Sequence, residues 1–146
     1  MQLTQHTDFG LRLLILLARS GGGPIALPNF AADQRLSYNH VAKVAQALVR
    51  AGFIISHRGR SGGVSLARPA DEITVGEVVR ALEPGMRLAN CSGCALRSDC
   101  TTSNVLADAL AAFLAVLDRV ALVEAAKPGN PAFAAWAAVA PPSPSS

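Results

Sequence analysis

The fold of this chain is decided by residues 37–52, Ser37-Tyr38-Asn39-His40-Val41-Ala42-Lys43-Val44-Ala45-Gln46-Ala47-Leu48-Val49-Arg50-Ala51-Gly52. In a helix, one face of this stretch would be apolar, with Val41, Val44, Ala45 and Leu48. Ser37 is a suitable N-cap and Gly52 a suitable C′ residue, so the pattern predicts a helix that ends near Arg50. The other faces of this helix are largely polar and basic.

Two helical signals precede this helix. Residues 3–19 predict a first helix, which is ended by the run Ser20-Gly21-Gly22-Gly23-Pro24. Residues 28–34 predict a short second helix, because Pro28 suits the first helical turn. The resulting order of helix, helix, turn and helix predicts a helix-turn-helix.

A basic hairpin is predicted directly after it. Residues 53–56 and 64–66 are strand-like, and they are joined by the glycine-rich run His57-Arg58-Gly59-Arg60-Ser61-Gly62-Gly63. The predicted fold class is therefore mainly α: a winged helix-turn-helix domain with a two-stranded β wing, followed by a long helix.

A helix of this size fits the major groove of duplex DNA, where its early residues meet base edges. Asn39 can pair with adenine, Lys43 with guanine or phosphate, and the hairpin arginines can enter a minor groove or hold phosphates. Tyr38 could instead pack across the turn, and His40 could be a surface residue without a DNA contact. The candidate DNA-binding residues are Ser37, Tyr38, Asn39, His40, Lys43, Arg58 and Arg60.

The charge distribution favours a polyanionic partner for the first half of the chain. The 146 residues carry a net charge of +3, but residues 1–70 hold eight basic and two acidic side chains, and residues 71–146 hold five and eight. The start of the chain does not resemble a signal peptide, and the apolar run 11–18 is far shorter than the roughly 20 residues of a membrane span. We therefore expect a cytoplasmic protein without a membrane partner.

The second half is predicted to contain a dimerisation helix. Thr74-Val75-Gly76-Glu77 has the form of a capping box and opens a fourth helix, and a long helix is predicted over about residues 102–126. Its apolar side chains alternate in steps of four and three, as in a helix that pairs with a partner helix, although a single-chain core helix would show a similar stripe. The expected domains are 1–83, 84–126 and a disordered tail, 127–146, and the expected dimer residues are Leu106, Leu110, Phe113, Leu117 and Val120.

Three cysteines lie between these parts in the order Cys91-x2-Cys94-x5-Cys100. An odd number of cysteines in a reducing compartment favours metal or redox chemistry over disulfides. A structural zinc site needs four ligands, and no nearby residue supplies the fourth. An iron–sulfur cluster accepts a non-cysteine ligand, so a carboxylate or histidine from elsewhere could complete it. Three reactive thiols without metal are the alternative.

Several short motifs together resemble one family. They are Gln2-Leu3-Thr4 with Thr7-Asp8-Phe9-Gly10-Leu11-Arg12, Ser37-Tyr38-Asn39-His40, Arg50-Ala51-Gly52-Phe53, Arg58-Gly59-Arg60-Ser61-Gly62-Gly63-Val64, Gly76-Glu77-Val78-Val79-Arg80, Leu82-Glu83-Pro84, the cysteine triplet and Phe113-Leu114-Ala115-Val116-Leu117-Asp118. In this combination the chain resembles the NsrR/IscR family of bacterial winged-helix iron–sulfur repressors over about residues 1–124.

The resemblance implies a homodimer with crossing long helices that binds operator DNA. It implies a cluster, 4Fe-4S or 2Fe-2S, held by Cys91, Cys94 and Cys100 of one subunit and Asp8 of the other. The IscR type has a histidine shortly after the third cysteine, and this chain has none, so the nitric-oxide-sensing type is the better match. His6 is a competing candidate ligand. The implied function is a repressor that loses operator affinity when its cluster is nitrosylated.

Other functions are also compatible with parts of the sequence. The same fold could sense cluster status or redox state. A thiol oxidoreductase using Cys91-x-x-Cys94 would normally place that motif beside a βαβ unit, and no parallel-sheet pattern is present. A cluster carrier without DNA binding is disfavoured by the basic first half. The expectation is that the chain is not an enzyme.

Overall fold

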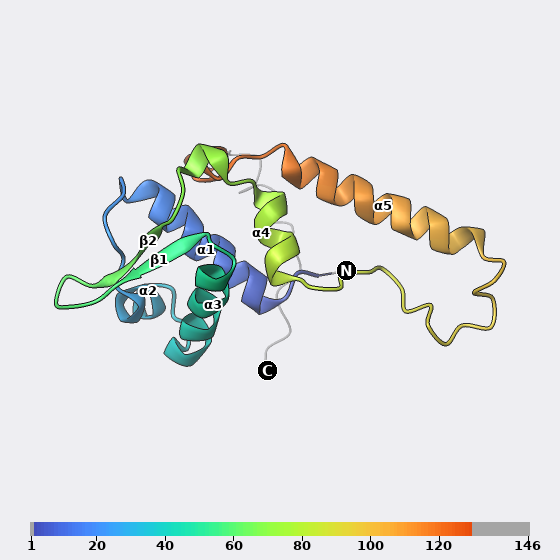
Figure 1. Ribbon diagram of the computed structural model, residues 1–146, viewed down its shortest axis with the longest axis horizontal. Helices are drawn as coiled ribbons and strands as arrows, with labels where there is room; N and C mark the ends of the chain where they lie inside the picture. The colour runs from blue at the N-terminus through green and yellow to red at the C-terminus, as the bar shows by residue number, and fades with distance from the viewer. Residues whose placement is uncertain (1, 130–146) are drawn as a thin grey trace.

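The protein has a winged-helix body, whose core includes residues of α1 to α4 and also Leu122 near the end of the described chain. The computed structural model describes residues 2–129 (Figure 1). Most of the tail that was expected to be disordered, residues 130–146, lies outside the described residues. The elements are α1 (Gln5–Arg19), α2 (Leu27–Asp33), α3 (Tyr38–Arg50), β1 (Ile54–His57), β2 (Gly63–Leu66), the 3-10 helix η1 (Ala70–Glu72), α4 (Val75–Leu82), α5 (Thr101–Asp118) and α6 (Leu122–Ala125). The predicted fold class is confirmed.

The helix-turn-helix consists of α2 and α3, packed together beside α1. The buried face of α3 is the predicted one, with Val41, Val44, Ala45 and Leu48. Gly52 follows the helix at φ 79°, as expected of a C′ glycine. Ser37 has the extended backbone of an N-cap, but its side chain makes no capping hydrogen bond. The first helix begins at Gln5 rather than at residue 3, because Thr4 accepts a hydrogen bond from the Thr7 amide.

The wing is an antiparallel hairpin in which Ile54 pairs with Leu66 and His57 pairs with Gly63. Its second strand is held to the body by Ile25, which exchanges two backbone hydrogen bonds of 2.9 Å with Val64. At Gly63 a Cβ atom would collide with the backbone of Ile25, so only glycine allows this approach. The wing is therefore attached rigidly at its base, while its tip projects away from the body (Figure 1).

The long helix ends earlier than predicted. The sequence indicated a helix to about residue 126, but α5 ends at Asp118, and Val120 lies between α5 and α6. Two backbone hydrogen bonds replace the helical ones there: the Val75 amide donates to Val120 over 2.9 Å, and the Leu122 amide donates to Ile73 over 2.7 Å. Leu122 is fully buried in the core against α1 and η1, so burial of this side chain outweighs continuation of the helix. The expectation that Val120 lies on the dimerisation helix is therefore wrong.

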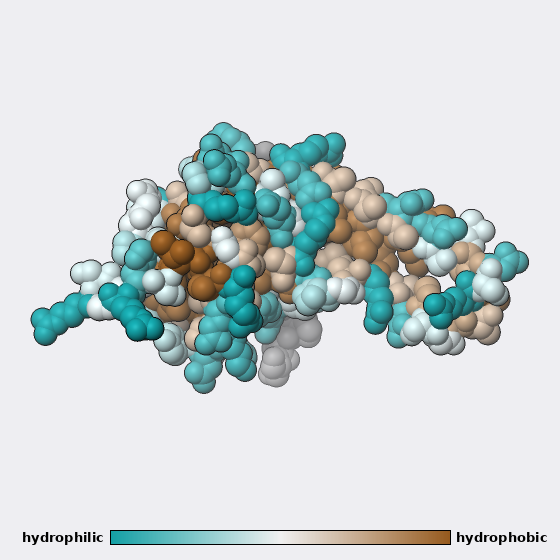
Figure 2. Space-filling view, viewed as in Figure 1, coloured by the Kyte–Doolittle hydropathy of each residue, from teal (hydrophilic) through white to brown (hydrophobic). Residues whose placement is uncertain are grey.

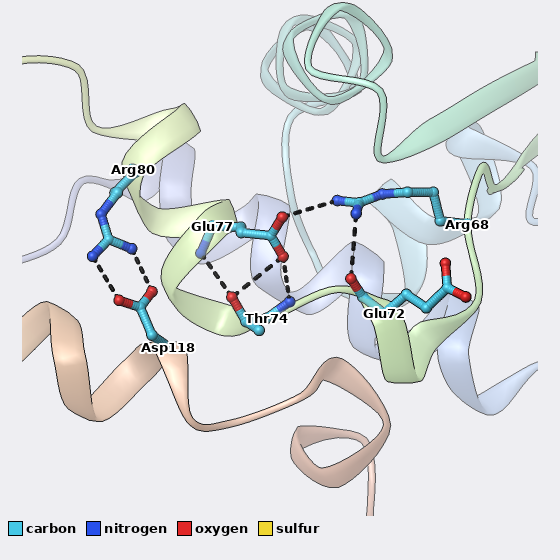
Figure 3. Close-up of polar contacts among 6 residues, drawn as sticks. All are labelled: Arg68, Glu72, Thr74, Glu77, Arg80 and Asp118. Atoms are coloured by element: carbon cyan, nitrogen blue, oxygen red, sulfur yellow. Dashed lines mark hydrogen bonds and ion pairs between the residues drawn. The ribbon is translucent and has the colours of Figure 1, made fainter.

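The joint between α4 and α5 is a close contact around Asp118 (Figure 3). Arg80 donates two hydrogen bonds to the Asp118 carboxylate, one of them 2.7 Å long, and these bonds lower the pKa of Asp118 below its ordinary value. A Cβ atom on Gly76 would collide with the Asp118 side chain and lie 2.9 Å from its backbone nitrogen. The predicted capping box of Thr74 and Glu77 is present at the start of α4, one turn before Arg80. The joint therefore fixes where α5 meets the body.

Most of α5 stands away from the body as an arm (Figure 1), and its surface shows apolar side chains (Figure 2). No residue of α5 is buried. The predicted dimer residues on this helix are half-buried, and a second apolar stripe, formed by Val105, Ala109, Ala112 and Val116, is exposed. Within residues 2–129, α5 is the one helix whose length and apolar composition would also fit a membrane span. A helix that is apolar on two adjacent faces needs a cover.

Gly76→Ala is expected to destabilise the protein by about 1–3 kcal/mol, the range for forcing an extra carbon into a filled contact. The measurement is the urea midpoint of unfolding. Gly23→Ala is the matched control, because a Cβ there meets nothing closer than a carbonyl at 3.9 Å. Equal midpoints for the two variants would show that the α4–α5 contact is not tight.

Candidate functional site

The predicted recognition residues form an exposed surface on α3. Ser37, Tyr38, Asn39, His40 and Lys43 are all exposed, whereas the opposite face of the helix is in the core. Tyr38 is 51% exposed, so it does not fill the turn. The helix therefore presents one polar face to the outside and is held by its apolar one, as a helix that enters a DNA groove must be.

The predicted wing residues lie at the tip of the hairpin. Arg58 and Arg60 are exposed, and the turn between them uses Gly59 at φ 103° with a 3.0 Å hydrogen bond from the Gly62 amide to the Gly59 carbonyl. Figure 2 shows this end of the molecule as a hydrophilic projection. The recognition helix and the basic wing are thus parts of one body.

A cavity of about 460 Å³ separates the start of α1 from α3, and the sequence did not indicate it. His6 lies on the α1 side, and His40 and Lys43 lie on the α3 side. Phe9 and Val44, both buried, also line it. The structure therefore places His6 beside the recognition helix rather than beside the cysteines.

Glu83 connects the start of α1 with the end of α4. Its Oε1 atom accepts hydrogen bonds from the Thr4 amide at 2.6 Å and from the Thr4 and Thr7 hydroxyls at 2.7 Å each. Burial opposes ionisation of this carboxyl, but the three hydrogen bonds and the nearby His6 outweigh it and lower the pKa of Glu83 below the ordinary value of 4.5. Glu83 also precedes the segment that carries the cysteines, residues 84–100, called the cysteine loop below.

The cysteine loop runs outward from α4 to the far end of α5 (Figure 1). It contains turns but no helix or strand, with backbone hydrogen bonds such as Cys94 amide to Cys91 carbonyl at 3.3 Å. Cys91 and Cys100 are half-buried and Cys94 is exposed, and all three are free thiols. Cys91 also borders a cavity of about 260 Å³ against Leu106 and Leu110 of α5.

The three thiols are suitable ligands for a soft metal or an iron–sulfur cluster, and Cys100 is the N-cap of α5, where a helix favours negative charge. Within the described residues of one chain, no three histidine, cysteine or acidic side chains are close enough together to hold a metal ion. To bind a metal ion or a cluster, the cysteine loop would have to change its conformation so that the three thiols come together. Such a change is possible because the loop contains no helix or strand. The three thiols are therefore of the right chemical type for such a group, but the described residues of one chain do not bring them together with each other or with another ligand.

Asp8, the predicted fourth ligand, is paired within its own helix. Arg12 donates to Asp8 Oδ2 over 2.6 Å and to Oδ1 over 3.0 Å, and both side chains are 45% exposed. The carboxylate is therefore at the surface, held only by an exposed ion pair.

Together, the body, the exposed face of α3 and the basic wing define a DNA-binding transcriptional regulator of the winged helix-turn-helix class. The family described as Rrf2, iron-dependent transcriptional regulator, matches residues 3–128. The chain belongs to this family, whose members are DNA-binding regulators rather than enzymes.

Individual relatives agree with this assignment. A protein of Shouchella clausii (strain KSM-K16) named HTH-type transcriptional regulator NsrR is 41% identical over 125 residues, which cover 82% of this chain and 84% of that protein. The crystal structure of oxidized Staphylococcus aureus CymR is similar with a TM-score of 0.72 at 31% identity, covering 89% of this chain and 99% of that one. For T. potens IscR the TM-score is 0.73 at 27% identity, with 90% of each chain covered.

Glu83→Gln is expected to lower the melting temperature at pH 7 and to flatten its fall in acid. Because folding lowers the pKa of Glu83, its stabilising contribution is present above 4.5 and is lost as the pH falls through the lower folded value. The measurement is thermal unfolding between pH 7 and pH 3.5. Glu72→Gln is the control, since Figure 3 shows its carboxylate without a partner among the residues drawn. If the melting temperatures of Glu83→Gln and of the parent changed with pH in parallel, the hydrogen bonds of Glu83 to Thr4 and Thr7 would not stabilise the protein.

Proposed function

We propose that this regulator is a cytoplasmic homodimeric repressor whose operator affinity depends on an iron–sulfur cluster and is released by nitric oxide. The cluster would be held by Cys91, Cys94 and Cys100 of one subunit and the partner subunit's Asp8. Two features of the single chain support the proposal, and each indicates that a partner is needed. Within residues 2–129, the three free thiols are not part of any group of side chains that could hold a metal ion, and no residue of the apolar arm that follows them is buried. One dimer would supply both the cover and the ligand.

The residues of α5 fit a partner helix. Its predicted seam, Leu106, Leu110, Phe113 and Leu117, is half-buried, and the two leucines nearest the loop border the cavity beside Cys91. The second stripe, with Val105 at 58% and Val116 at 51% exposure, is open to another molecule. Ala109 and Ala112 between them would let a second helix approach closely. Pairing of two arms would bring each cysteine loop toward the other subunit.

The mechanism follows from where the ligands lie. The cysteines precede the arm, and Asp8 is in the first turn of α1, the helix that packs against α3. A ligand set drawn from both would fix the body of one subunit against the arm of the other, and hence the spacing of the two recognition helices that an operator requires. Bound there, the cluster would supply iron that nitric oxide attacks with loss of protein ligands. Asp8, once free, has Arg12 as a partner in its own helix.

The proposal predicts the outcome of mixing two variants. In a dimer of one Asp8→Asn chain and one Cys100→Ala chain, ligation between subunits leaves one complete ligand set, whereas ligation within a subunit leaves none. Anaerobic native mass spectrometry of differently tagged, co-expressed chains should therefore find one cluster in the mixed dimer and none in the Cys100→Ala homodimer. The Asp8→Asn homodimer should bind the operator more weakly, by a factor in the range of roughly 5–150 that is typical of coupled sites.

A control variant tests whether the effect is specific to Asp8. Asp99→Asn changes the acid next to Cys100 and should retain the cluster and the response to nitric oxide. Mixed dimers without a cluster, or Asp8→Asn protein that responds to nitric oxide as the parent does, would contradict the proposal.

The arm makes a separate prediction. Val116→Glu is expected to weaken dimerisation strongly, because it places a charge in the exposed stripe of α5, while the body stays folded. Light scattering after size exclusion measures the mass. Val123→Glu is the matched control, since Val123 is 40% exposed and belongs to α6 rather than to the arm. A Val116→Glu protein that remains a dimer would place the interface elsewhere.

A second candidate signal is direct oxidation of the cysteines, and the exposure of Cys94 favours it. Spectra of anaerobically prepared protein distinguish the two signals. Bleaching of cluster absorbance by nitric oxide supports the first, and a colourless protein whose DNA affinity responds to peroxide supports the second.

A further inference from the structure

The cavity between α1 and α3 combines several groups that attract an anion. Lys43 and His40 border it from the recognition helix, and His6 borders it from α1. The four ion pairs of the described residues all lie elsewhere, so no acidic partner engages these three side chains. Glu83 is the acid near His6, and its Oε1 atom already accepts three hydrogen bonds from Thr4 and Thr7.

The backbone of α1 adds donors at the same place. Thr4, Gln5 and His6 line the cavity and form the start of a 15-residue helix. The Thr4 side chain satisfies the Thr7 amide and the Thr4 carbonyl satisfies the Asp8 amide, which leaves the Gln5 and His6 amides without acceptors in the helix. Amides in this position bind phosphate oxygens.

If α3 enters the major groove, the cavity would lie beside a sugar–phosphate backbone of the duplex. The exposed residues Asn39, Lys43 and Gln46 recur along one stripe of α3, the part of the helix that would enter the major groove. A groove about 12 Å wide is bordered by a sugar–phosphate backbone on each side of an inserted helix. His40, on the flank of that stripe, borders the cavity, so one backbone would pass over it.

We propose that this cavity holds one backbone phosphate of the operator, which makes Gln5 and His6 of α1 DNA-contacting residues beside His40 and Lys43. The inference rests on the proposed function only in requiring that α3 enters the major groove. It has a consequence for regulation, because Asp8 lies in the same first turn of this helix. The segment that supplies the proposed fourth ligand would also touch DNA.

The test uses Gln5→Glu in the full-length protein. A carboxylate at the first position of a helix favours the helix, so the melting temperature should not fall. The same carboxylate repels a phosphate in the cavity. Affinity is measured by fluorescence anisotropy at several salt concentrations, on a duplex selected by the wild-type protein from a random library. We expect Gln5→Glu to lower affinity by about tenfold, the value of one charge-assisted hydrogen bond, and to reduce the salt slope by about 1.

Arg119→Gln is the matched control, because it changes the net charge by the same amount at the exposed end of α5. It should change neither affinity nor slope by much. Duplexes in which single phosphates are replaced by uncharged methylphosphonates locate the contact. At one position in each half-site, neutralisation should weaken wild-type binding and have no further effect on Gln5→Glu.

The outcomes separate this inference from the DNA-binding function itself. Arg58→Gln tests the wing, whose contacts do not involve the cavity. If Arg58→Gln weakens binding while Gln5→Glu matches Arg119→Gln, the phosphate site is wrong and DNA recognition stands. Methylphosphonates that weaken Gln5→Glu and the wild type equally at every position would also overturn the site. Failure of the wild type to select any duplex would instead defeat the DNA-binding function.

Discussion

The close approach of α4 and α5 at Gly76 and Asp118 is the constraint on which the arrangement of this molecule depends. Only glycine allows the backbone of Asp118 to come so near α4, and Arg80 then holds the Asp118 carboxylate from the next turn. The chain beyond α5 is secured by Leu122 in the core and by the hydrogen bonds of Val75 and Leu122. The far end of the arm, where the cysteines are, is therefore oriented by contacts within the body.

The cysteine loop is likewise held at its two ends by the helices that flank it. The loop begins after Glu83, which is tied to Thr4 and Thr7, and it ends where α5 begins. Both of its ends are thus fixed to helices, while its interior has only turns. A loop of this kind can adjust to a bound group without loss of regular structure. At the Glu83 end, such an adjustment reaches the first turn of α1 through hydrogen bonds of 2.6 and 2.7 Å.

The sequence predicted most of the body, because its elements depend on local signals. The apolar face of α3, Gly52 after it, the glycine-rich wing and the capping box of α4 each come from residues a few positions apart. The end of α5 could not be predicted in this way. Apolar periodicity continues through Val120 and Leu122, and only the tertiary contacts of Leu122 with α1 and η1 decide that the helix stops. The cavity between α1 and α3 was missed for the same reason, since His6 and His40 are far apart in sequence.

The strengths of the contacts around Asp8 indicate what could drive a switch. An exposed i,i+4 ion pair contributes about 0.3–0.5 kcal/mol, and the Asp8–Arg12 pair is 45% exposed on both sides. Such a pair changes an equilibrium by about twofold, whereas coupling between sites is typically worth about 1–3 kcal/mol. In the proposed mechanism, Arg12 would therefore be too weak a partner to draw Asp8 away from a ligand position, and it would only keep the carboxylate in place after release. In the proposed mechanism, the free energy that separates the two states would have to come from ligation at the cysteines, and the α4–α5 joint and the hydrogen bonds of Glu83 to α1 would carry it to the recognition helix.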